Sequence, residues 1–179
     1  MPIQTRRASL ADLRTAAELF DGYRQFYGQP ADFPLAEAFL RDRLTNDDSV
    51  IFLASDPASG TGLGFVQLYP SFSSVAARRI WILNDLFVAA TARRRGVGRA
   101  LLDAARDHGV ATGANRLVLS TAATNHEARA LYESYGYKPD DVFLVYKLEL
   151  VAPKLPVTRT RSDKDDGSHS RAGIGSTIR

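Results

Sequence analysis

The residues best suited to chemistry form a run of arginines and glycines in the middle of the chain. Arg93-Arg94-Arg95-Gly96-Val97-Gly98-Arg99 follows a strongly apolar segment and precedes an amphipathic one. Two glycines one residue apart let the backbone bend and approach a ligand closely. The amides of such a turn and the dipole of the helix after it favour an anion such as a pyrophosphate. Arginines at the rim add charge-assisted contacts to the oxygens of that anion.

The same run is also consistent with a basic turn that only caps a helix. It differs from two nucleotide-binding motifs. A Walker A loop ends in Gly-Lys-Ser/Thr, whereas Gly98 is followed by Arg99 and Ala100. The dinucleotide fingerprint has a third glycine at the position where Leu101 stands.

The elements around this turn predict a mixed α/β domain. Helical spacing of apolar residues predicts helices over 9–27, 34–44, 97–105 and 128–135. Short apolar runs predict strands over 2–8, 50–54, 63–69, 80–88, 116–120 and 142–150, and the Ser-rich segment 70–79 is predicted as a loop or ragged edge. The apolar pattern stops at Val151, which predicts one domain over 1–151 and a disordered tail over 152–179.

Charge and composition argue against several function classes. The net charge of +3 comes from the tail, so the predicted domain is neutral, which is a poor basis for nucleic-acid binding. The sequence has no membrane-length apolar run, no recognisable signal peptide and no cysteine. These features favour a cytoplasmic location. The three histidines show no metal-ligand spacing, so we expect no metal site.

Three motifs together resemble the Gcn5-related N-acetyltransferase (GNAT) family. Arg93-x-x-Gly96-x-Gly98 resembles the coenzyme A pyrophosphate loop of the family, and the segment 84–88 resembles its fourth strand. The segment 125–137, Asn-x-x-Ala-x-x-Leu-Tyr-x-x-x-Gly-Tyr here, resembles a third family motif. The resemblance implies a mixed, mostly antiparallel central sheet flanked by helices, the fold of acyl-CoA N-acyltransferases.

The resemblance also implies an activity and a cosubstrate. Members of the family transfer an acetyl group from acetyl-CoA to a primary amine, here of a small molecule or a protein. The amine attacks directly in a ternary complex, without a metal. Family members often dimerise, so a homodimer remains open, whereas no nucleic acid or membrane partner is expected.

Family logic gives roles to particular positions of this chain. Tyr132 matches the usual hydroxyl donor to the coenzyme A sulfur, and Asn125 matches the position that holds the cofactor arm. Backbone groups of Phe87 and Val88 are expected to pair with the pantetheine arm and face the thioester carbonyl. All seven residues of the 93–99 run are expected to contribute to phosphate binding. A packing role for Tyr132 is the alternative.

The base that deprotonates the amine is left open by the sequence. Asp85 is the nearest carboxylate, although pairing with Arg78 or Arg79 would occupy it. Asn84 could act only through a bound water, because an amide is not a base. The segment 80–88 most resembles the diamine, polyamine and small histone-type acetyltransferases. Diamine acetyltransferases commonly carry Glu where Asn84 stands.

Acceptor specificity is expected from the first two helices and the 70–79 segment, because loops vary over a fixed cofactor platform. Six aromatic residues could line a pocket for a cation: Tyr23, Phe26, Tyr27, Tyr69, Phe72 and Trp81. The alternative function is a coenzyme A-binding regulatory module that has lost catalysis. The missing Glu at position 84 favours that alternative, and the retained Tyr132 argues against it.

Overall fold

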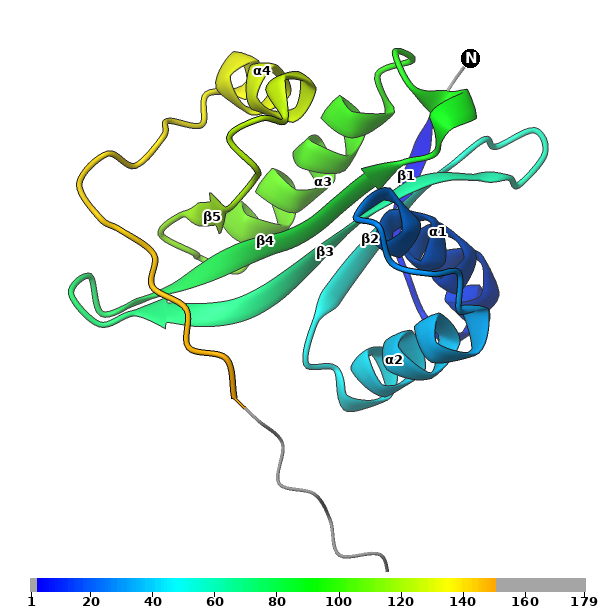
Figure 1. Cartoon of the computed structure of the whole chain (residues 1–179), viewed down its shortest axis with the longest axis horizontal. Coiled ribbons are helices and arrows are strands. Elements are labelled where there is room, and N and C mark those ends of the chain that lie inside the picture. The colour runs from blue at the N-terminus through cyan, green and yellow to red at the C-terminus, as the bar shows by residue number, and fades with distance from the viewer. Residues whose placement is uncertain (1–2, 151–179) are drawn as a thin grey trace, which may run out of the picture. The chain divides into compact units, whose positions relative to one another are not determined.

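A computed structural model of the chain describes residues 3–150, and a five-stranded sheet lies at its centre (Figure 1). The strands, in sheet order, are β1 (Gln4–Arg7), β2 (Val50–Ser55), β3 (Gly62–Ser73), β4 (Arg78–Val88) and β5 (Leu117–Leu119). Neighbours from β1 to β4 are antiparallel, and β5 is parallel to β4. The predicted mixed, mostly antiparallel sheet is confirmed.

Two pairs of helices cover the two faces of the sheet (Figure 1). The helices α1 (Leu13–Phe26) and α2 (Phe33–Asn46) lie on one face, and α3 (Val97–Ala111) and α4 (His126–Tyr135) lie on the other. Each face has its own core. The α3 side buries Val66, Leu68, Leu83, Leu101 and Tyr132, among others, and the α1 side buries Leu13, Ala16, Leu40, Ile51 and Phe65.

Capping residues set the ends of several helices. Ser9 and Asp12 form a capping box, but around a short 3-10 turn, Leu10–Asp12, that leads into α1. Asp32 accepts a hydrogen bond from the Leu35 amide, 3.0 Å, and begins α2. Gly136, with a φ of 105°, ends α4 as predicted.

The segment 70–79, predicted as a loop or ragged edge, is strand for most of its length. β3 continues to Ser73 and β4 begins at Arg78, so only the turn between them lacks strand structure. Pro70 does not break β3 because β2 pairs with β3 only as far as Leu68, which leaves an open edge beyond it. The Trp81 amide, opposite Pro70, binds Arg116 on the other side, so the missing N–H of Pro70 faces the open edge.

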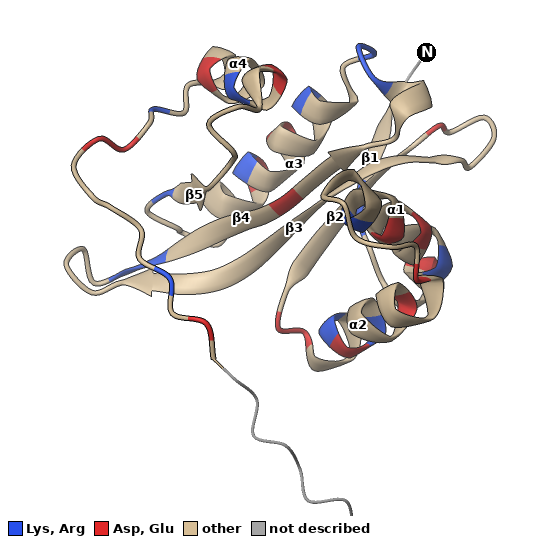
Figure 2. Cartoon of the chain, viewed as in Figure 1, with Lys and Arg blue, Asp and Glu red and all other residues tan. Residues whose placement is uncertain are grey.

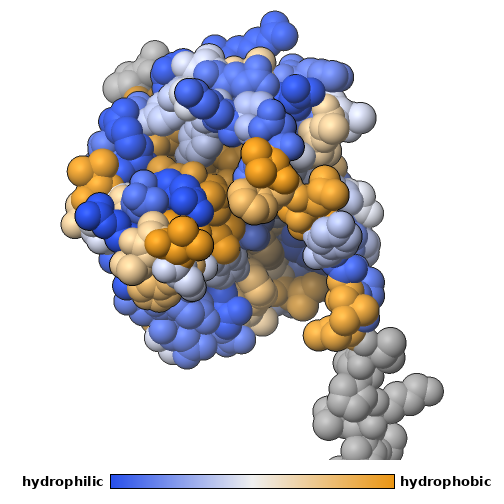
Figure 3. All heavy atoms as spheres, turned by 90° about the vertical axis from the view of Figure 1, so that its left-hand side faces the viewer, coloured by the Kyte–Doolittle hydropathy of each residue, from blue (hydrophilic) through white to orange (hydrophobic). Residues whose placement is uncertain are grey.

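The predicted strand over 142–150 is also wrong. The described chain from Asp140 has no regular secondary structure, and its large apolar residues, such as Phe143 and Tyr146, are exposed. Figure 3 shows apolar side chains exposed on this side of the surface. Apolar alternation favours a strand, but a strand requires a hydrogen-bonded neighbour. In the described part of this segment, the Val142 and Phe143 amides donate to the Asp140 carboxylate, 3.0 and 3.1 Å.

Contacts divide the chain into a compact unit that ends at Pro139 and a second unit that begins at Asp140. The predicted domain end at residue 151 and the predicted tail over 152–179 lie outside the described residues. Within residues 3–150, no helix is both long enough and apolar enough to cross a membrane.

Candidate active site

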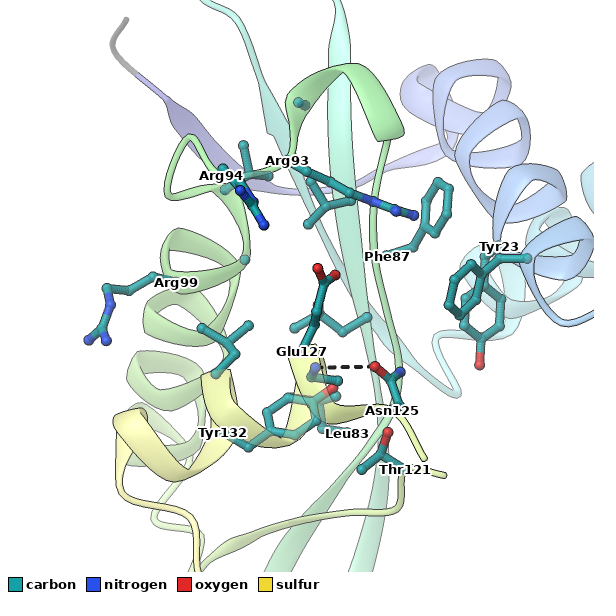
Figure 4. Close-up of a pocket in the computed structure, with 18 of the residues that line it drawn as sticks. Tyr23, Leu83, Phe87, Arg93, Arg94, Arg99, Thr121, Asn125, Glu127 and Tyr132 are labelled. Carbon is teal, nitrogen blue, oxygen red and sulfur yellow. Dashed lines mark hydrogen bonds between the residues drawn. The ribbon is translucent and has the colours of Figure 1, made fainter. Parts of the chain in front are cut away.

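A cavity of about 610 Å³ opens between β4, the N-terminal ends of α3 and α4, and the C-terminal end of α1 (Figure 4). Its lining includes most of the residues that the sequence singled out: Asn84, Phe87, Val88, Arg93, Arg94, Gly96, Val97, Gly98, Arg99, Asn125 and Tyr132. Asp85 and Arg95 are not among the lining residues. The fold therefore brings three distant segments of the sequence to one place.

β4 loses its β5 neighbour where the cavity begins. β5 pairs with β4 only over Trp81–Leu83. A register shift between Gln67 and Leu68 of β3 leaves Asn84 without a paired residue. Along Asn84–Val88, no described strand pairs with the β5-side edge of β4, so its backbone groups are free to bind a ligand there.

Along β4, the backbone N–H and C=O groups of successive residues point alternately toward β3 and toward the open edge. The Ala89 amide donates to the Leu63 carbonyl of β3, 2.9 Å, and a Cβ added at Gly64 of β3 would clash with the Phe87 carbonyl. Phe87 and Ala89 therefore face β3, and Leu86 and Val88 face the open edge. Leu86 is a residue that the sequence analysis did not name.

The glycine turn has the conformation that an anion site requires. Gly96 precedes α3 with a left-handed φ of 84°, and Arg94 has a φ of 58°. A Cβ at Gly98 would lie 3.0 Å from the Leu131 side chain of α4. These positions bring the first amides of α3 to the cavity wall, where the helix dipole favours negative charge.

The arginines of the run point in different directions. Figure 4 shows Arg93 extending across the cavity toward α1, whereas Arg99 points away from it. The Arg93 guanidinium lies 5.8 Å from the centre of the Phe26 ring. Arg99 donates to the Ser134 hydroxyl, 3.2 Å, and lies over Tyr135, 5.7 Å.

Tyr132 projects its ring from α4 into the cavity (Figure 4). The residue is 9% exposed. Burial, with smaller effects of Tyr27 and Tyr137, raises the pKa of Tyr132 to about 12. Its hydroxyl therefore stays protonated at neutral pH and can act as a hydrogen-bond donor.

Two other residues near the start of α4 line the cavity. Asn125 is the N-cap of α4, because its side-chain oxygen accepts a hydrogen bond from the Ala128 amide, 3.2 Å. Glu127, which the sequence analysis did not name, points into the cavity (Figure 4). A Glu in the first turn of a helix is common. The sequence therefore contains no signal that distinguishes Glu127 as a cavity residue.

Asp85 is buried directly behind the cavity wall and is only 4% exposed. Figure 2 shows it as an acidic segment in the middle of β4, of which it is the only acidic residue. Asn84 donates to both carboxylate oxygens, 3.1 Å each, and Tyr23 donates a further hydrogen bond. Burial raises the pKa of Asp85, although the hydrogen bonds from Asn84 and Tyr23 oppose the shift.

The predicted pairing of Asp85 with an arginine is not found among the described ion pairs. Arg79 lies instead over the rings of Phe72 and Trp81. Tyr23 and Asn84 both line the cavity, so each connects the buried carboxylate to the space where a ligand would bind.

The aromatic pocket is smaller than expected. Tyr23, Phe26 and Tyr27 of α1 line the cavity, and Tyr69, Phe72 and Trp81 do not. Trp81 is buried in the core and donates to Thr112, 2.8 Å. Phe26 and Tyr27 follow Tyr23 by three and four residues, one helical turn along, at the end of α1. The sequence alone does not show which element this face of α1 meets.

The described residues contain no group of three or more acidic or histidine side chains arranged to hold a metal. His126 lies in the first turn of α4. His108 is half-buried against Trp81, with ring centres 4.7 Å apart. Burial lowers the pKa of His108.

Comparison with known proteins gives one consistent result. The model of the acetyltransferase (GNAT) family matches residues 14–137. An uncharacterized N-acetyltransferase of Bacillus subtilis, YhfO, is 48% identical over 147 residues, which are 82% of this chain and 97% of the relative. A probable acetyltransferase of Haemophilus influenzae is 33% identical over 80% of this chain and 96% of its own length.

Solved structures agree with the sequence relatives. The crystal structure of a probable acetyltransferase is 41% identical and superposes with a TM-score of 0.79. The match covers 84% of this chain and 99% of that protein.

Proposed function

Since this chain belongs to the acetyltransferase (GNAT) family and is an acyltransferase, we propose that it transfers the acetyl group of acetyl-CoA to a primary amine. The observation that carries the proposal is the cavity itself. It joins an anion-binding turn, an open strand edge and a buried tyrosine donor on one side to an aromatic wall backed by a carboxylate on the other. These are the features that acetyl transfer to an amine requires.

The residues present fit acetyl-CoA as the cosubstrate. The amides that follow Gly96 and the Arg94 side chain would hold the pyrophosphate. The open edge at Leu86 and Val88 would pair with the amides of the pantetheine arm, and Asn125, which lines the same cavity, would help to hold it. When bound, acetyl-CoA supplies an activated acetyl group.

Tyr132 assists departure of the thiolate. As the nitrogen–carbon bond forms and the carbon–sulfur bond breaks, its hydroxyl donates a proton to the sulfur, and the proton that the nitrogen loses on becoming an amide restores the Tyr132 hydroxyl. An N–H of the open β4 edge can donate to the carbonyl oxygen while negative charge develops there. Both groups act on charge that is larger in the transition state than in the bound substrates, so they lower the barrier to reaction.

Deprotonation of the amine is assigned to Asp85 acting through Tyr23. An alkyl ammonium has a pKa of about 10.4, so the reacting amine must lose a proton at neutral pH. The Tyr23 oxygen can accept that proton while its own hydroxyl proton passes to Asp85. Burial that raises the pKa of Asp85 makes it a better proton acceptor than an exposed carboxylate.

Two relatives support an amine acceptor through their names. A D-amino-acid N-acetyltransferase of Saccharomyces cerevisiae is 32% identical over 50% of this chain, and an L-ornithine N5-acetyltransferase of Arabidopsis thaliana is 30% identical over 60%. A regulatory coenzyme A-binding module, the alternative, would need the cofactor end of the cavity only. It gives no reason for a carboxylate held behind Tyr23.

The test is turnover of acetyl-CoA with a panel of amines, followed by release of free thiol. The panel should contain diamines, amino acids, aminoglycosides and lysine-containing peptides. We expect amine-dependent release and an N-acetylated product of the correct mass. Binding of coenzyme A without acetylation of any amine would favour the regulatory module instead.

A further inference from the structure

Gln67, in the middle of β3, is a polar residue with no exposed surface. Its side-chain nitrogen donates to the Ser49 hydroxyl, 2.9 Å. Its side-chain oxygen is also buried and has no hydrogen-bond partner within residues 3–150. Leaving a buried polar atom unpaired costs free energy, so such atoms are rare in folded proteins. The unpaired oxygen of Gln67 therefore calls for a partner that is a donor only part of the time.

Strand pairing places Gln67 directly opposite Asp85. The two residues are register partners in the antiparallel pair of β3 and β4, which stays in register from Gly64 to Gln67. Opposite residues of such a pair carry their side chains on the same face, with Cβ atoms about 4.5–5.5 Å apart. Asp85 is only 4% exposed. Two buried polar side chains are therefore neighbours across the two strands.

The contact with Ser49 determines how the Gln67 amide is turned. Ser49 directly precedes β2, and β2 and β4 lie on opposite sides of β3. The nitrogen and oxygen of a side-chain amide diverge from one carbon atom. An amide that directs its nitrogen to Ser49 therefore turns its oxygen away from Ser49. On the β4 side, the register partner of Gln67 is Asp85.

The protonation state of Asp85 decides whether it can pair with this oxygen. An ionised carboxylate only accepts hydrogen bonds, whereas a protonated carboxyl has one O–H to donate. Asn84 and Tyr23 donate to the ionised form. Only the protonated form can satisfy Gln67. A carbonyl beside Asp85 therefore favours the state that holds a proton.

The other titratable groups around Asp85 keep their protons at neutral pH. Tyr23 faces it from α1 and Tyr69 from β3, and burial raises the pKa of both hydroxyl groups, that of Tyr69 to about 12. Arg43 and Asp48, which influence the pKa of Tyr69, form an ion pair, 2.9 Å, and offset each other. Of these three neighbouring groups, Asp85 is therefore the one that can change its charge in the working pH range.

We propose that Gln67 is a positioning residue for proton transfer, and that its side-chain carbonyl accepts a hydrogen bond from Asp85 once Asp85 holds the proton of the amine. The inference rests on the proposed function, in which that proton arrives through Tyr23. The ammonium nitrogen loses one proton to the Tyr23 oxygen, the Tyr23 hydroxyl proton moves to Asp85, and the new Asp85 hydroxyl donates to Gln67. The proton leaves by the same route in reverse after the product departs.

The experiment compares wild type with three variants. Gln67→Met keeps the length of the side chain and removes the carbonyl, and Ser49→Ala keeps the carbonyl and removes its anchor. Val66→Ala is the matched control, because Val66 is the next residue of β3 and is buried in the core on the α3 side. For each protein, kcat/KM and the free energy of unfolding are measured against pH, with and without Asp85→Asn. The unfolding measurement needs no substrate.

In Gln67→Met we expect the Asp85-dependent step of kcat/KM to move to lower pH by about one unit, since a net hydrogen bond to the protonated form is lost. The Asp85-dependent fall in stability with rising pH should shrink correspondingly, because the native carboxyl binds its proton less tightly. Ser49→Ala should shift both in the same direction and by less. Val66→Ala should lower stability at every pH and leave the step where it is.

An unchanged step in folded Gln67→Met would overturn the inference and make Gln67 a packing residue. A step moved to higher pH would also overturn it, because the amide would then donate to the ionised carboxylate. If Gln67→Met does not fold, an unshifted Ser49→Ala protein overturns it instead. A stability shift together with a wild-type kcat/KM profile equal to that of Asp85→Asn would support the hydrogen bond and contradict the proton route of the proposed function.

Discussion

At the scale of single residues, two tyrosines of α4 differ in their surroundings and not in their chemistry. Tyr132 and Tyr135 lie three residues apart on α4, and both hydroxyl groups have a pKa raised to about 12. Tyr135 donates to Asp103, 2.8 Å, outside the cavity, whereas Tyr132 lines it. The family motif predicts Tyr132 as the donor, and the packing places Tyr132 rather than Tyr135 at the cavity.

We expect Tyr132→Phe to lower kcat by roughly tenfold or more, with acetyl-CoA affinity little changed. The ring and its packing remain, and only the proton donor to sulfur is lost, an effect of about 10²- to 10⁴-fold when no water substitutes. Steady-state kinetics on the best amine measure the change. Tyr135→Phe is the matched control and should retain wild-type kcat. Equal kcat in all three proteins would make Tyr132 a packing residue.

Asp85→Asn should separate activity from stability. Loss of the proton acceptor should lower kcat/KM by about 10²-fold. The wild-type kcat/KM should rise with pH through the raised pKa of Asp85, because the carboxylate is the active form, and the variant should lack that rise. Tyr23→Phe, which removes the connecting hydroxyl, should behave similarly. A full wild-type pH profile in Asp85→Asn would exclude Asp85 as the proton acceptor.

The stability of the same variant should change in the opposite direction. A carboxyl whose folded pKa is raised binds more protons in the native state than in the unfolded chain, where its pKa is about 3.9. Stability therefore falls as pH rises from about 4 through the raised value. We expect Asp85→Asn to escape that fall and to melt higher than wild type at pH 7. A lower melting temperature at pH 7 would show that the ionised carboxylate stabilises the fold.

At the scale of elements, the sequence identified the parts whose signals are local. The glycine turn, the start of α2 near Pro34 and the end of α4 at Tyr135 depend on residues within one turn of the chain. The strand over 70–73 was missed because Pro70 was expected to break it. Proline disrupts a strand only where its absent N–H would have paired, and at Pro70 that side of β3 is an open edge. The buried pairing of Tyr23 with Asp85 joins α1 to β4, and no spacing in the sequence predicts such a contact.

Gly98→Val should abolish coenzyme A binding. The substitution places branched carbon atoms at the cavity wall in the first turn of α3, where a Cβ alone would lie 3.0 Å from Leu131. Calorimetry with coenzyme A measures the effect. Gly109→Ala, in the same helix, is the control, because its Cβ would make only an ordinary contact with Leu117, 3.7 Å. Unchanged affinity in a folded Gly98→Val protein would contradict the assignment of this turn.

At the scale of the whole molecule, the distribution of charge indicates which class of ligand the protein binds. The net charge of +3 belongs to the C-terminal segment beyond Val151, and the remainder is neutral. The cationic groups of the cavity are therefore local features of a neutral domain. They favour a small anionic ligand at one site over a polyanion spread across a broad basic face.

Removal of residues 152–179 should leave both the melting temperature and turnover nearly unchanged. The segment contains few apolar residues and several Pro, Ser, Gly and charged residues, so it can bury little surface in return for the entropy of ordering it. Its basic excess also lies in a different part of the sequence from the residues that line the cavity.

The comparison is between the full chain and a chain that ends at Val151, by thermal unfolding and by kcat/KM on the same amine. At low ionic strength a small salt-dependent change in the KM of acetyl-CoA is acceptable, because a basic segment attracts an anion at a distance. A drop of several degrees in melting temperature, or a tenfold loss of turnover that salt does not remove, would show that the segment packs against the domain and belongs to the working enzyme.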